Sequence, residues 1–452
     1  MHEFENNYPD HTHRPAKALW TRRRFVSAMA TTAASATGLA LLTSGCSSPR
    51  APSGRANAER RRRVAIIATE VRIHSHAQHF IDRFLEGYGW HGAWHHPPMD
   101  VAALYVDQFP ANDLARERSR RFGVPIYPTI AEALTLGGPK LAVDGVLIIG
   151  EHGKYPRNEK GQTLYPRYKF FKEVVKVFEA SGRAVPVFQD KHLSTKWQEC
   201  LEQVADSRRL GFPFLAGSSL PVTWRIPSID MPLNTSLKES LCVCYGGVDS
   251  YDFHGLETAQ CMSERRAGGE TGVKSVHALR GDRIWTLLAE RGVAQRLLFA
   301  ALARSHTVRA PDGYPCVVPT LAWIKQCCPD AVAYFIEHND GFRTSMFLLN
   351  RLVQDFSYAG MTNESGKIIS CQMHLPMPMH ISTTADFFNS LVNNVEWMIV
   401  NGRTPYRVER TLLTSGMTLS AVESLYRGGV KIDTPEMRIA YEPMAKSTFW
   451  RA

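Results

Sequence analysis

The sequence predicts an α/β protein in which a parallel β-sheet with helices on both faces is followed by an α+β part with a large, mostly antiparallel sheet. Two observations support this. Between residues 64 and 210, short apolar runs alternate with stretches of helical spacing, the pattern of strand–helix units in a parallel sheet. Beyond about residue 215 the strand-like runs are longer, and one of them, 272–279, alternates apolar and polar residues. We therefore predict domains at 64–210 and 211–452.

The elements follow in chain order. Each predicted strand of the first part is a short run rich in Val, Ile, Leu and Ala, and the first helix carries Phe80, Phe84 and Leu85 at helical spacing. In the first part we predict strands at 63–68, 101–106, 143–150 and 184–188 and helices at 75–88, 112–122, 129–134 and 168–180. In the second part we predict strands at 240–245, 272–279 and 436–441 and an amphipathic helix at 386–400.

The N-terminus has the pattern of a twin-arginine export signal. Arg22-Arg23-Arg24-Phe25 is followed by a charge-free stretch rich in Ala, Thr and Ser that runs to Pro49. The hydroxyls in this stretch make it weakly apolar, which argues against a membrane anchor. We predict a signal region at 1–46, a Ser/Pro/Arg-rich linker at 47–63, the twin-arginine translocase as a partner during export, and a periplasmic or exported protein that folds, around any cofactor, before export.

Cys46 ends a segment that resembles a lipoprotein processing site, although Thr43 stands where such sites usually carry Leu. Two outcomes stay open: a lipid anchor at Cys46 that tethers the protein to the membrane, or cleavage to a free periplasmic form. The other eight cysteines have no zinc-site spacing, and we expect buried free thiols. Cys242 and Cys244 share one face of a strand, which does not suit a disulfide between them.

The charge excludes a nucleic-acid surface. Of the net charge of +10, residues 1–63 carry +7, with 11 Lys/Arg against 4 Asp/Glu, so +3 remains for the rest. The run Arg60–Arg63 is predicted to be a solvated tail before the first strand. We expect a small-molecule substrate as the partner, and the sequence leaves a homo-oligomer open.

The order of strand, helix, strand ending at Asp107, third strand and then Val187–Leu193 resembles the Gfo/Idh/MocA oxidoreductase family. The resemblance covers most of residues 64–445, and 405–414 is similar to a segment common near the C-terminus of those proteins. It implies a Rossmann-like first domain and hydride transfer between a nicotinamide cofactor, NAD or NADP, and a sugar-like or polyhydroxylated substrate. Exported members with a twin-arginine leader and a tightly held cofactor exist in that family.

The resemblance also implies catalytic residues. Asp190-Lys191-His192 stands at the family's Glu-Lys-Pro triplet, so Lys191 is expected near nicotinamide and substrate, with Asp190 on the cofactor side and His192 on the substrate side. A lysine at the carboxyl end of a strand can protonate or hydrogen-bond a substrate oxygen. The alternative is a surface lysine that is paired with Asp190.

Residues 250–257 are the closest match to the family's Asp-x-Gly-x-His-x-x-Asp helix. The match assigns His254 as acid/base and Glu257, three residues on and on the same helical face, as the carboxylate that orients the ring. Ser250 and Asp252 depart from the family pattern. The alternative is a histidine that is satisfied by a backbone carbonyl.

The first strand-to-helix turn departs from the family's Gly-x-Gly-x-x-Gly. This chain has Ala68-Thr69-Glu70-Val71-Arg72-Ile73, so Glu70 brings bulk and negative charge where backbone and phosphate should touch, and Arg72 offsets one charge. Ala68 and Thr69 remain the cofactor contacts expected here. Asp107 suits a ribose hydroxyl, which favours NAD over NADP, and its alternative is a capping or turn aspartate.

An insertion at 151–166 lengthens the loop after the third strand, at the sheet edge where such folds bind ligands. We expect either a lid with substrate contacts from His152, Tyr155 and Arg157, or a surface excursion.

A different chemistry also stays open, since two His and a carboxylate suffice for a metal that activates water. The alternative function is therefore the same fold without a dinucleotide, as a metal-assisted hydrolase or lyase or a non-catalytic ligand-binding protein. The acidic and histidine residues that suggest a metal are Glu151, His152, Asp190, His192, Asp252, His254 and Glu257, whose spacing is no recognised metal motif.

Overall fold

The computed structural model describes residues 60–311, 318–376, 384–446 and 448–450. The predicted export signal, Cys46 and Cys316 lie outside these ranges, as does most of the predicted linker. Within them, no helix is both long and apolar enough to cross a bilayer. The seven described cysteines are free and six of them are buried, which confirms the expected free thiols for these residues.

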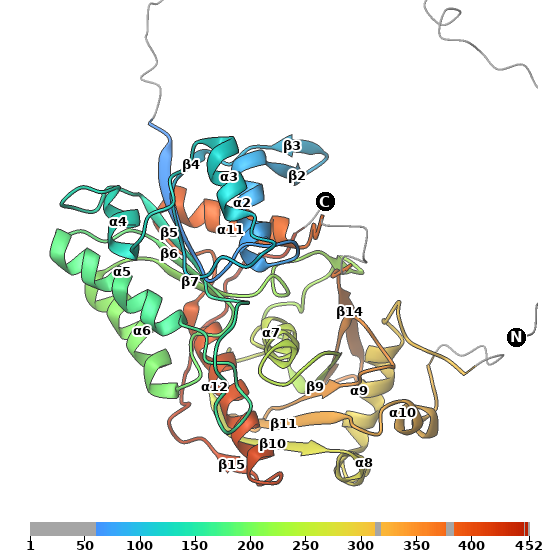
Figure 1. Cartoon of the computed structure of the whole chain (residues 1–452). Helices are drawn as coiled ribbons and strands as arrows, with labels where there is room; N and C mark the ends of the chain where they lie inside the picture. The colour runs from blue at the N-terminus through green and yellow to red at the C-terminus, as the bar shows by residue number, and fades with distance from the viewer. Residues whose placement is uncertain (1–59, 312–317, 377–383, 447, 451–452) are drawn as a thin grey trace, which may run out of the picture. The chain divides into compact units, whose positions relative to one another are not determined.

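The first sheet is five-stranded and parallel, in the order β4-β1-β5-β6-β7. Helices cover both of its faces (Figure 1), so Val64 and Ile66 enter one core and Ala65 and Ile67 the other. The predicted α/β class is confirmed. The strands are β1 (Arg62–Ala68), β4 (Met99–Val106), β5 (Gly145–Ile149), β6 (Val187–Asp190) and β7 (Phe214–Gly217); α2 (His76–Glu86) and α3 (Ala115–Phe122) cover one face, and α4 (Ile130–Thr135), α5 (Arg167–Ser181) and α6 (Trp197–Leu210) the other.

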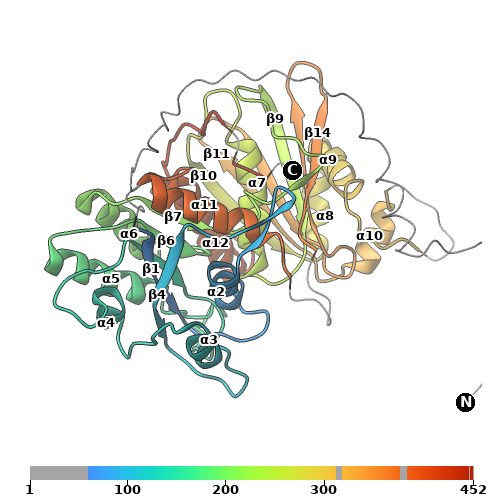
Figure 2. The same ribbon diagram turned by 90° about the horizontal axis from the view of Figure 1, so that it is seen from above.

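The second sheet has eight strands in the order β15-β10-β11-β12-β9-β13-β14-β8, all neighbours being antiparallel except β12 and β9. Figures 1 and 2 show α7 and α12 on the side of this sheet that faces the first sheet and α8, α9 and α10 on the other side. The strands are β8 (Arg225–Ile226), β9 (Leu237–Cys244), β10 (Val273–Arg280), β11 (Val332–His338), β12 (Arg343–Leu348), β13 (Phe356–Thr362), β14 (Ile368–Met373) and β15 (Ile432–Asp433). The helices are α7 (Tyr251–Ser263), α8 (Asp282–Ala289), α9 (Gly292–Leu302), α10 (Leu321–Cys327) and α12 (Val408–Tyr426).

Two further elements frame the edge of the first sheet. A short hairpin, β2 (Tyr88–Trp90) with β3 (Ala93–His95), follows α2, and α11 (Phe388–Asn401) packs against α2 and the hairpin. The strand order of the first sheet reverses between β1 and β5, so the loops after these two strands leave in different directions. A crevice at the carboxyl ends of the strands is expected at such a switch point.

Two local predictions are wrong. Residues 436–441 form no strand: β15 ends at Asp433, and Pro435, which lacks a backbone N–H, precedes the segment, where only Tyr441 bridges to Glu270. The run 60–63 does not lie wholly before the first strand, because β1 begins at Arg62; Arg60 and Arg61 stay mostly exposed and pair with Asp144 at 2.9 Å and with Asp100 at 2.7 Å. The first sheet also extends past the predicted boundary at 210, since β7 is its edge strand.

Candidate active site

A cavity of about 290 Å³ lies at the carboxyl ends of the first sheet, against the N-terminal end of α7. It receives side chains from the loop after β1, the loop after β5, the residue after β6 and α7, together with an apolar wall. Its lining residues are His74, His76, His79, Glu151, His152, Lys191, Ser219, Leu220, Ser250, Tyr251, His254, Leu375, Phe387 and Phe388.

Lys191 and His254 meet in this cavity, as the sequence predicts. The Nζ atom of Lys191 contacts Nε2 of His254, and both residues are buried. Burial and the charge of Lys191 hold the pKa of His254 well below its usual value, so the ring is neutral and Nε2 accepts the bond. Nδ1 of His254, which then carries the proton, is buried without a partner among the described residues. Lys191 holds a φ of +70°, a left-handed backbone rare for a side chain of its size and more frequent at functional sites.

Glu151 supplies negative charge to the wall of this cavity. Burial alone would raise the pKa of this carboxyl, but the positive charges of Lys191 and Arg167 outweigh it and hold the pKa well below its usual range. Arg167 donates from Nη2 to the Glu151 carboxylate at 2.8 Å and from Nε to the Gly150 carbonyl at 3.0 Å. A Cβ at Gly150 would lie 2.7 Å from the Arg167 side chain, so this approach requires glycine. Glu151 therefore stays ionised beside Lys191.

His74, which precedes α2, and His76 and His79 of its first turn form a wall of the cavity that was not predicted from the sequence. His76 Nδ1 lies 2.6 Å from Oδ2 of the buried Asp190, which gives Asp190 a side-chain partner other than a cofactor. His79 stacks on Phe388 with ring centroids 4.8 Å apart, and burial lowers its pKa to about 2. The signal was present: residues 74, 76 and 79 lie within about one helical turn, and a helix brings 76 and 79 onto one face.

The loops after β1 and β5 are bonded to each other across the crevice. Oγ1 of Thr69 donates to the Glu151 carbonyl at 2.6 Å, and Arg72 Nη2 lies 3.3 Å from Nδ1 of His152. Glu70 is buried and pairs with Arg72 at 2.6 Å, so its charge is compensated within the turn. His152 lines the cavity as predicted, and burial lowers its pKa to about 3, so its ring is neutral.

The same loop also covers the end of β4. Tyr155 and Tyr105 donate their hydroxyls to the two carboxylate oxygens of Asp107, at 2.6 and 2.9 Å. The Gln108 side chain bonds the backbone of Lys154 in both directions, at 2.8 and 3.1 Å. Both carboxylate oxygens of the aspartate expected to bind a ribose thus already have partners.

The segment 151–166, here called the cover loop, is a built structure rather than a loose excursion. Asn158 closes a tight turn by accepting from the backbone N–H groups of Lys160 and Gln162, both at 3.0 Å. Gln162 then donates to Asp249 at 3.0 Å, and Lys160 pairs with Glu423 on α12. The loop is therefore held at both ends.

Three predicted substrate contacts do not reach the cavity. The hydroxyl of Tyr155 is bonded to Asp107, and Arg157 is exposed in the cover loop. His192 is buried between the Arg167 guanidinium at 3.1 Å and the Ser194 carbonyl at 3.1 Å. These assignments rested on position along the chain, which does not settle the direction of a side chain.

Glu257 does not orient His254. Its Oε2 accepts from the backbone N–H of Ser218 at 2.7 Å and from the Ser218 hydroxyl at 2.8 Å, while Thr411 donates to Oε1 at 3.3 Å. It sits against β7, where a Cβ at Gly217 would lie 2.7 Å from Oε1. Burial raises the pKa of Glu257 to about 7. The carboxyl is therefore a structural group outside the cavity.

Replacing Glu257→Gln is expected to remove a pH-dependent loss of stability. Because the pKa rises from its usual 4.5 to about 7 in the folded state, the folded state binds this proton more tightly, and the free energy of unfolding falls as pH rises through that window. The variant lacks this fall, so its free energy of unfolding relative to wild type should grow by up to about 3 kcal/mol between pH 5 and 8. Urea unfolding at four pH values measures it, and a constant difference would contradict it.

Within the described ranges, no set of three or more His, Cys, Asp or Glu side chains is placed to hold a metal ion. Asp252, one of the residues that suggested a metal, accepts the Tyr334 hydroxyl at 2.8 Å and the backbone N–H groups of Asp249, Ser250 and Phe253. It is part of the α7 N-terminus.

Comparison with known proteins identifies the fold. No family model and no curated protein sequence matches the chain. Among solved structures, the chain is similar to GenD2 from gentamicin A biosynthesis in complex with NAD, with a TM-score of 0.52 and 11% identity over 83% of this chain and 96% of that one. A probable dehydrogenase from Thermotoga maritima gives 0.51 and 12% over 83% and 99%, and myo-inositol dehydrogenase from Lactobacillus casei in complex with NAD(H) and myo-inositol gives 0.50 and 10% over 82% and 96%. The chain therefore has the two-sheet fold of these dehydrogenases.

Proposed function

We propose that the protein is an exported, periplasmic oxidoreductase of the Gfo/Idh/MocA type that transfers a hydride between a nicotinamide cofactor and a polyhydroxylated small molecule. The observation that carries the proposal is the Lys191–His254 pair in a cavity at the switch point of the first sheet. The fold shared with dehydrogenases, two of which were crystallised with NAD or NAD(H), supports it.

The residues of the cavity suit proton transfer at an alcohol. Lys191, which lines the cavity together with the ionised Glu151, donates a hydrogen bond to the substrate oxygen and stabilises developing negative charge there. When the substrate hydroxyl takes the place of Lys191 Nζ at Nε2, neutral His254 accepts the hydroxyl proton at this nitrogen as the carbon is oxidised, and it returns the proton in the reverse direction. A bound nicotinamide supplies the hydride chemistry. The wall of Leu375, Phe387 and Phe388 keeps water from the reacting carbon.

The fit to a dinucleotide differs between the two ends of the crevice. The cavity beside Lys191 suits a planar ring, with apolar and polar walls. At the other end Glu70 fills the phosphate turn, and Tyr155 holds the carboxylate of Asp107. A dinucleotide would therefore need the bond between Tyr155 of the cover loop and Asp107 to open, which would suit a cofactor that is inserted once and then retained.

Replacing Tyr155→Phe is expected to tighten NAD binding about 2- to 10-fold, because this hydrogen bond near the surface contributes about 0.5–1.5 kcal/mol to holding the loop against Asp107. The measurement is calorimetric titration of stripped protein with NAD. Tyr168→Phe is the matched control, since it also removes a phenol–carboxylate bond, to Glu202, but on α5 away from the crevice. An unchanged Kd for NAD in Tyr155→Phe would contradict the idea that Tyr155 and NAD compete for Asp107.

The proposal is tested on natively purified protein. Denaturation should release a nicotinamide, recognised by mass, absorbance and fluorescence, and a panel of inositols and hexoses should change the redox state of the bound cofactor. Protein without any nicotinamide and without affinity for NAD or NADP would end the proposal.

One observation favours a second candidate. Thr69 and Arg72 bond to the cover loop, and Asp107 accepts from Tyr155 of this loop, so these groups already have partners within the protein. The second candidate is therefore a protein of the same fold that binds its ligand beside the Lys191–His254 pair without a dinucleotide. Binding of a polyol by nicotinamide-free protein, measured by calorimetric titration, would support it.

A further inference from the structure

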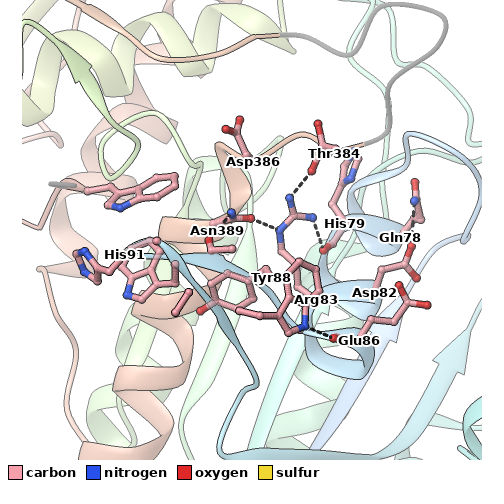
Figure 3. A pocket seen from close by; sticks show the side chains of 17 residues that line it. Gln78, His79, Asp82, Arg83, Glu86, Tyr88, His91, Thr384, Asp386 and Asn389 are labelled. Carbon is pink, nitrogen blue, oxygen red and sulfur yellow. Dashed lines mark hydrogen bonds between the residues drawn. The ribbon is translucent and has the colours of Figure 1, made fainter. Parts of the chain in front are cut away.

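A second and larger cavity, of about 730 Å³, lies beside α2 (Figure 3). It is formed by α2, the β2–β3 hairpin, the start of α11 and Trp450, and the His79–Phe388 stack stands at the boundary with the first cavity. Its volume is in the usual range for small-ligand sites, roughly 300–1,000 Å³. Its lining residues are Gln78, His79, Asp82, Arg83, Glu86, Gly87, Tyr88, Gly89, Trp90, His91, Gly92, Ala93, Trp94, Thr384, Asp386, Asn389 and Trp450.

The hairpin that carries two of the tryptophans is firmly held. Its turn residues His91 and Gly92 both have positive φ, +48° and +76°, as a two-residue hairpin turn requires. Glu396 on α11 accepts the Tyr88 hydroxyl at 2.7 Å and lies 2.8 Å from Nε2 of His95. The hairpin is therefore a rigid support.

The indole rings are fixed although they reach solvent. Trp94 is 65% exposed, and its N–H donates to the Glu86 carbonyl at 3.0 Å. Gly87 permits this contact, because a Cβ there would lie 2.8 Å from the Trp94 nitrogen. Trp90 stacks on Trp450 with centroids 4.9 Å apart and 24° between the planes. A large apolar side chain held in the open in this way is a preformed binding surface.

The side chains that line the cavity limit the class of ligand that it can bind. Among the described residues that line it there is no Leu, Ile, Val, Met or Phe, so these residues offer a lipid or an apolar peptide little aliphatic surface to bury against. Arg83 already donates to four acceptors, namely the Asn389 side chain and the carbonyls of His79, Thr384 and Ala385 (Figure 3 labels Asn389, His79 and Thr384), so its guanidinium is not free to bind a phosphate.

A cationic ligand is also disfavoured. The carboxylates of Asp82 and Glu86 are paired with Arg118 and Arg121, at 2.9 and 2.8 Å, so they do not form a charged cage. Asp386, whose side chain is 46% exposed, still offers carboxylate oxygens to hydroxyl donors. What remains is a neutral ligand with many hydroxyls and an apolar face.

We propose that this cavity binds a neutral oligosaccharide, one of whose sugar rings lays its C–H face on the exposed Trp94 indole and whose hydroxyls bond the polar lining. The partly positive C–H groups meet the negative face of the indole ring. The site is separate from the Lys191 cavity, and this assignment stands whether or not the protein is a dehydrogenase.

The test is affinity electrophoresis of the purified protein in native gels that contain starch, dextran, laminarin, galactomannan or xyloglucan, followed by fluorescence titration with the hexasaccharide of the polymer that retards it. Wild type should be retarded by at least one polymer, and Trp94→Ala should weaken binding at least tenfold. Because Trp94 is mostly exposed, this variant should fold, which circular dichroism checks; Trp94→Tyr should keep most of the affinity.

Two controls separate this site from others. Trp323→Ala on α10 should bind like wild type, as should Lys191→Met in the first cavity. No retardation of wild type by any polymer, equal binding by Trp94→Ala, or loss of binding in Lys191→Met would each overturn the assignment.

Discussion

Replacing Lys191→Met is expected to lower kcat/KM at least 100-fold while the protein stays folded. A positioned acid–base group raises the rate about 10²–10⁴-fold. Nζ of Lys191 contacts His254, and Lys191 interacts electrostatically with Glu151. Methionine keeps the length of the side chain, and Arg167 still neutralises Glu151 at 2.8 Å, so no buried carboxylate is left without a partner. Turnover is measured with the polyol that proves active on the bound nicotinamide.

The matched control is Lys196→Met, five residues along the same segment. Its side chain is 72% exposed and pairs only with Glu199 at 3.0 Å, so activity should be unchanged. Identical activity of Lys191→Met and wild type would remove Lys191 from the mechanism. Loss of activity together with loss of the folded circular dichroism spectrum would assign it a structural role instead.

The largest effect on stability is expected from Arg410→Met. Arg410 on α12 and Glu264 after α7 are both buried and form two hydrogen bonds, one of 2.9 Å from Nε to Oε2, and Tyr441 donates to the same carboxylate at 2.8 Å. Removing the guanidinium leaves a buried charge, which typically costs about 3–5 kcal/mol. Urea unfolding followed by circular dichroism measures the loss.

The same substitution at an exposed pair is the control for this prediction. Arg208, 66% exposed, pairs with Glu409, the neighbour of Arg410, at 2.7 Å. Arg208→Met should change the free energy of unfolding by less than about 0.5 kcal/mol. Equal effects of the two variants would show that burial does not determine how much the Arg410–Glu264 pair contributes to the free energy of unfolding.

Much of the first sheet could be predicted from local pattern. The runs at 64–68 and 101–106 are apolar enough to be buried strands wherever they pack, and Lys191 follows such a strand directly, at the edge where ligands bind. The helices 197–210 and 408–426 were not predicted, because polar and small residues interrupt the apolar spacing of their buried faces. These residues fit only the neighbours against which the helices pack. Gly416, for example, lies so close to Met437 and Trp197 that there is no room for a side chain.

Within the site, the residues that were assigned correctly differ from the others in how far along the chain their contacts reach. Lys191 and His254 were predicted through a family motif, while Tyr155 was assigned to substrate although its hydroxyl binds Asp107, 48 residues earlier. The histidines at 74, 76 and 79 were passed over because nothing near them in the chain indicates that Glu151 and Phe388 lie opposite.

The amino-acid sequence by itself determined the α/β architecture and the strand that delivers Lys191, because these depend on patterns of apolar residues a few positions apart. The helix that delivers His254 was implied by the family resemblance instead. The tertiary structure alone decided that the cover loop closes on Asp107, that Glu257 turns to Ser218, and that tryptophans 90 and 450 stack beside α2. Those contacts join residues far apart in the chain, and their geometry depends on how whole layers pack, which no local pattern encodes.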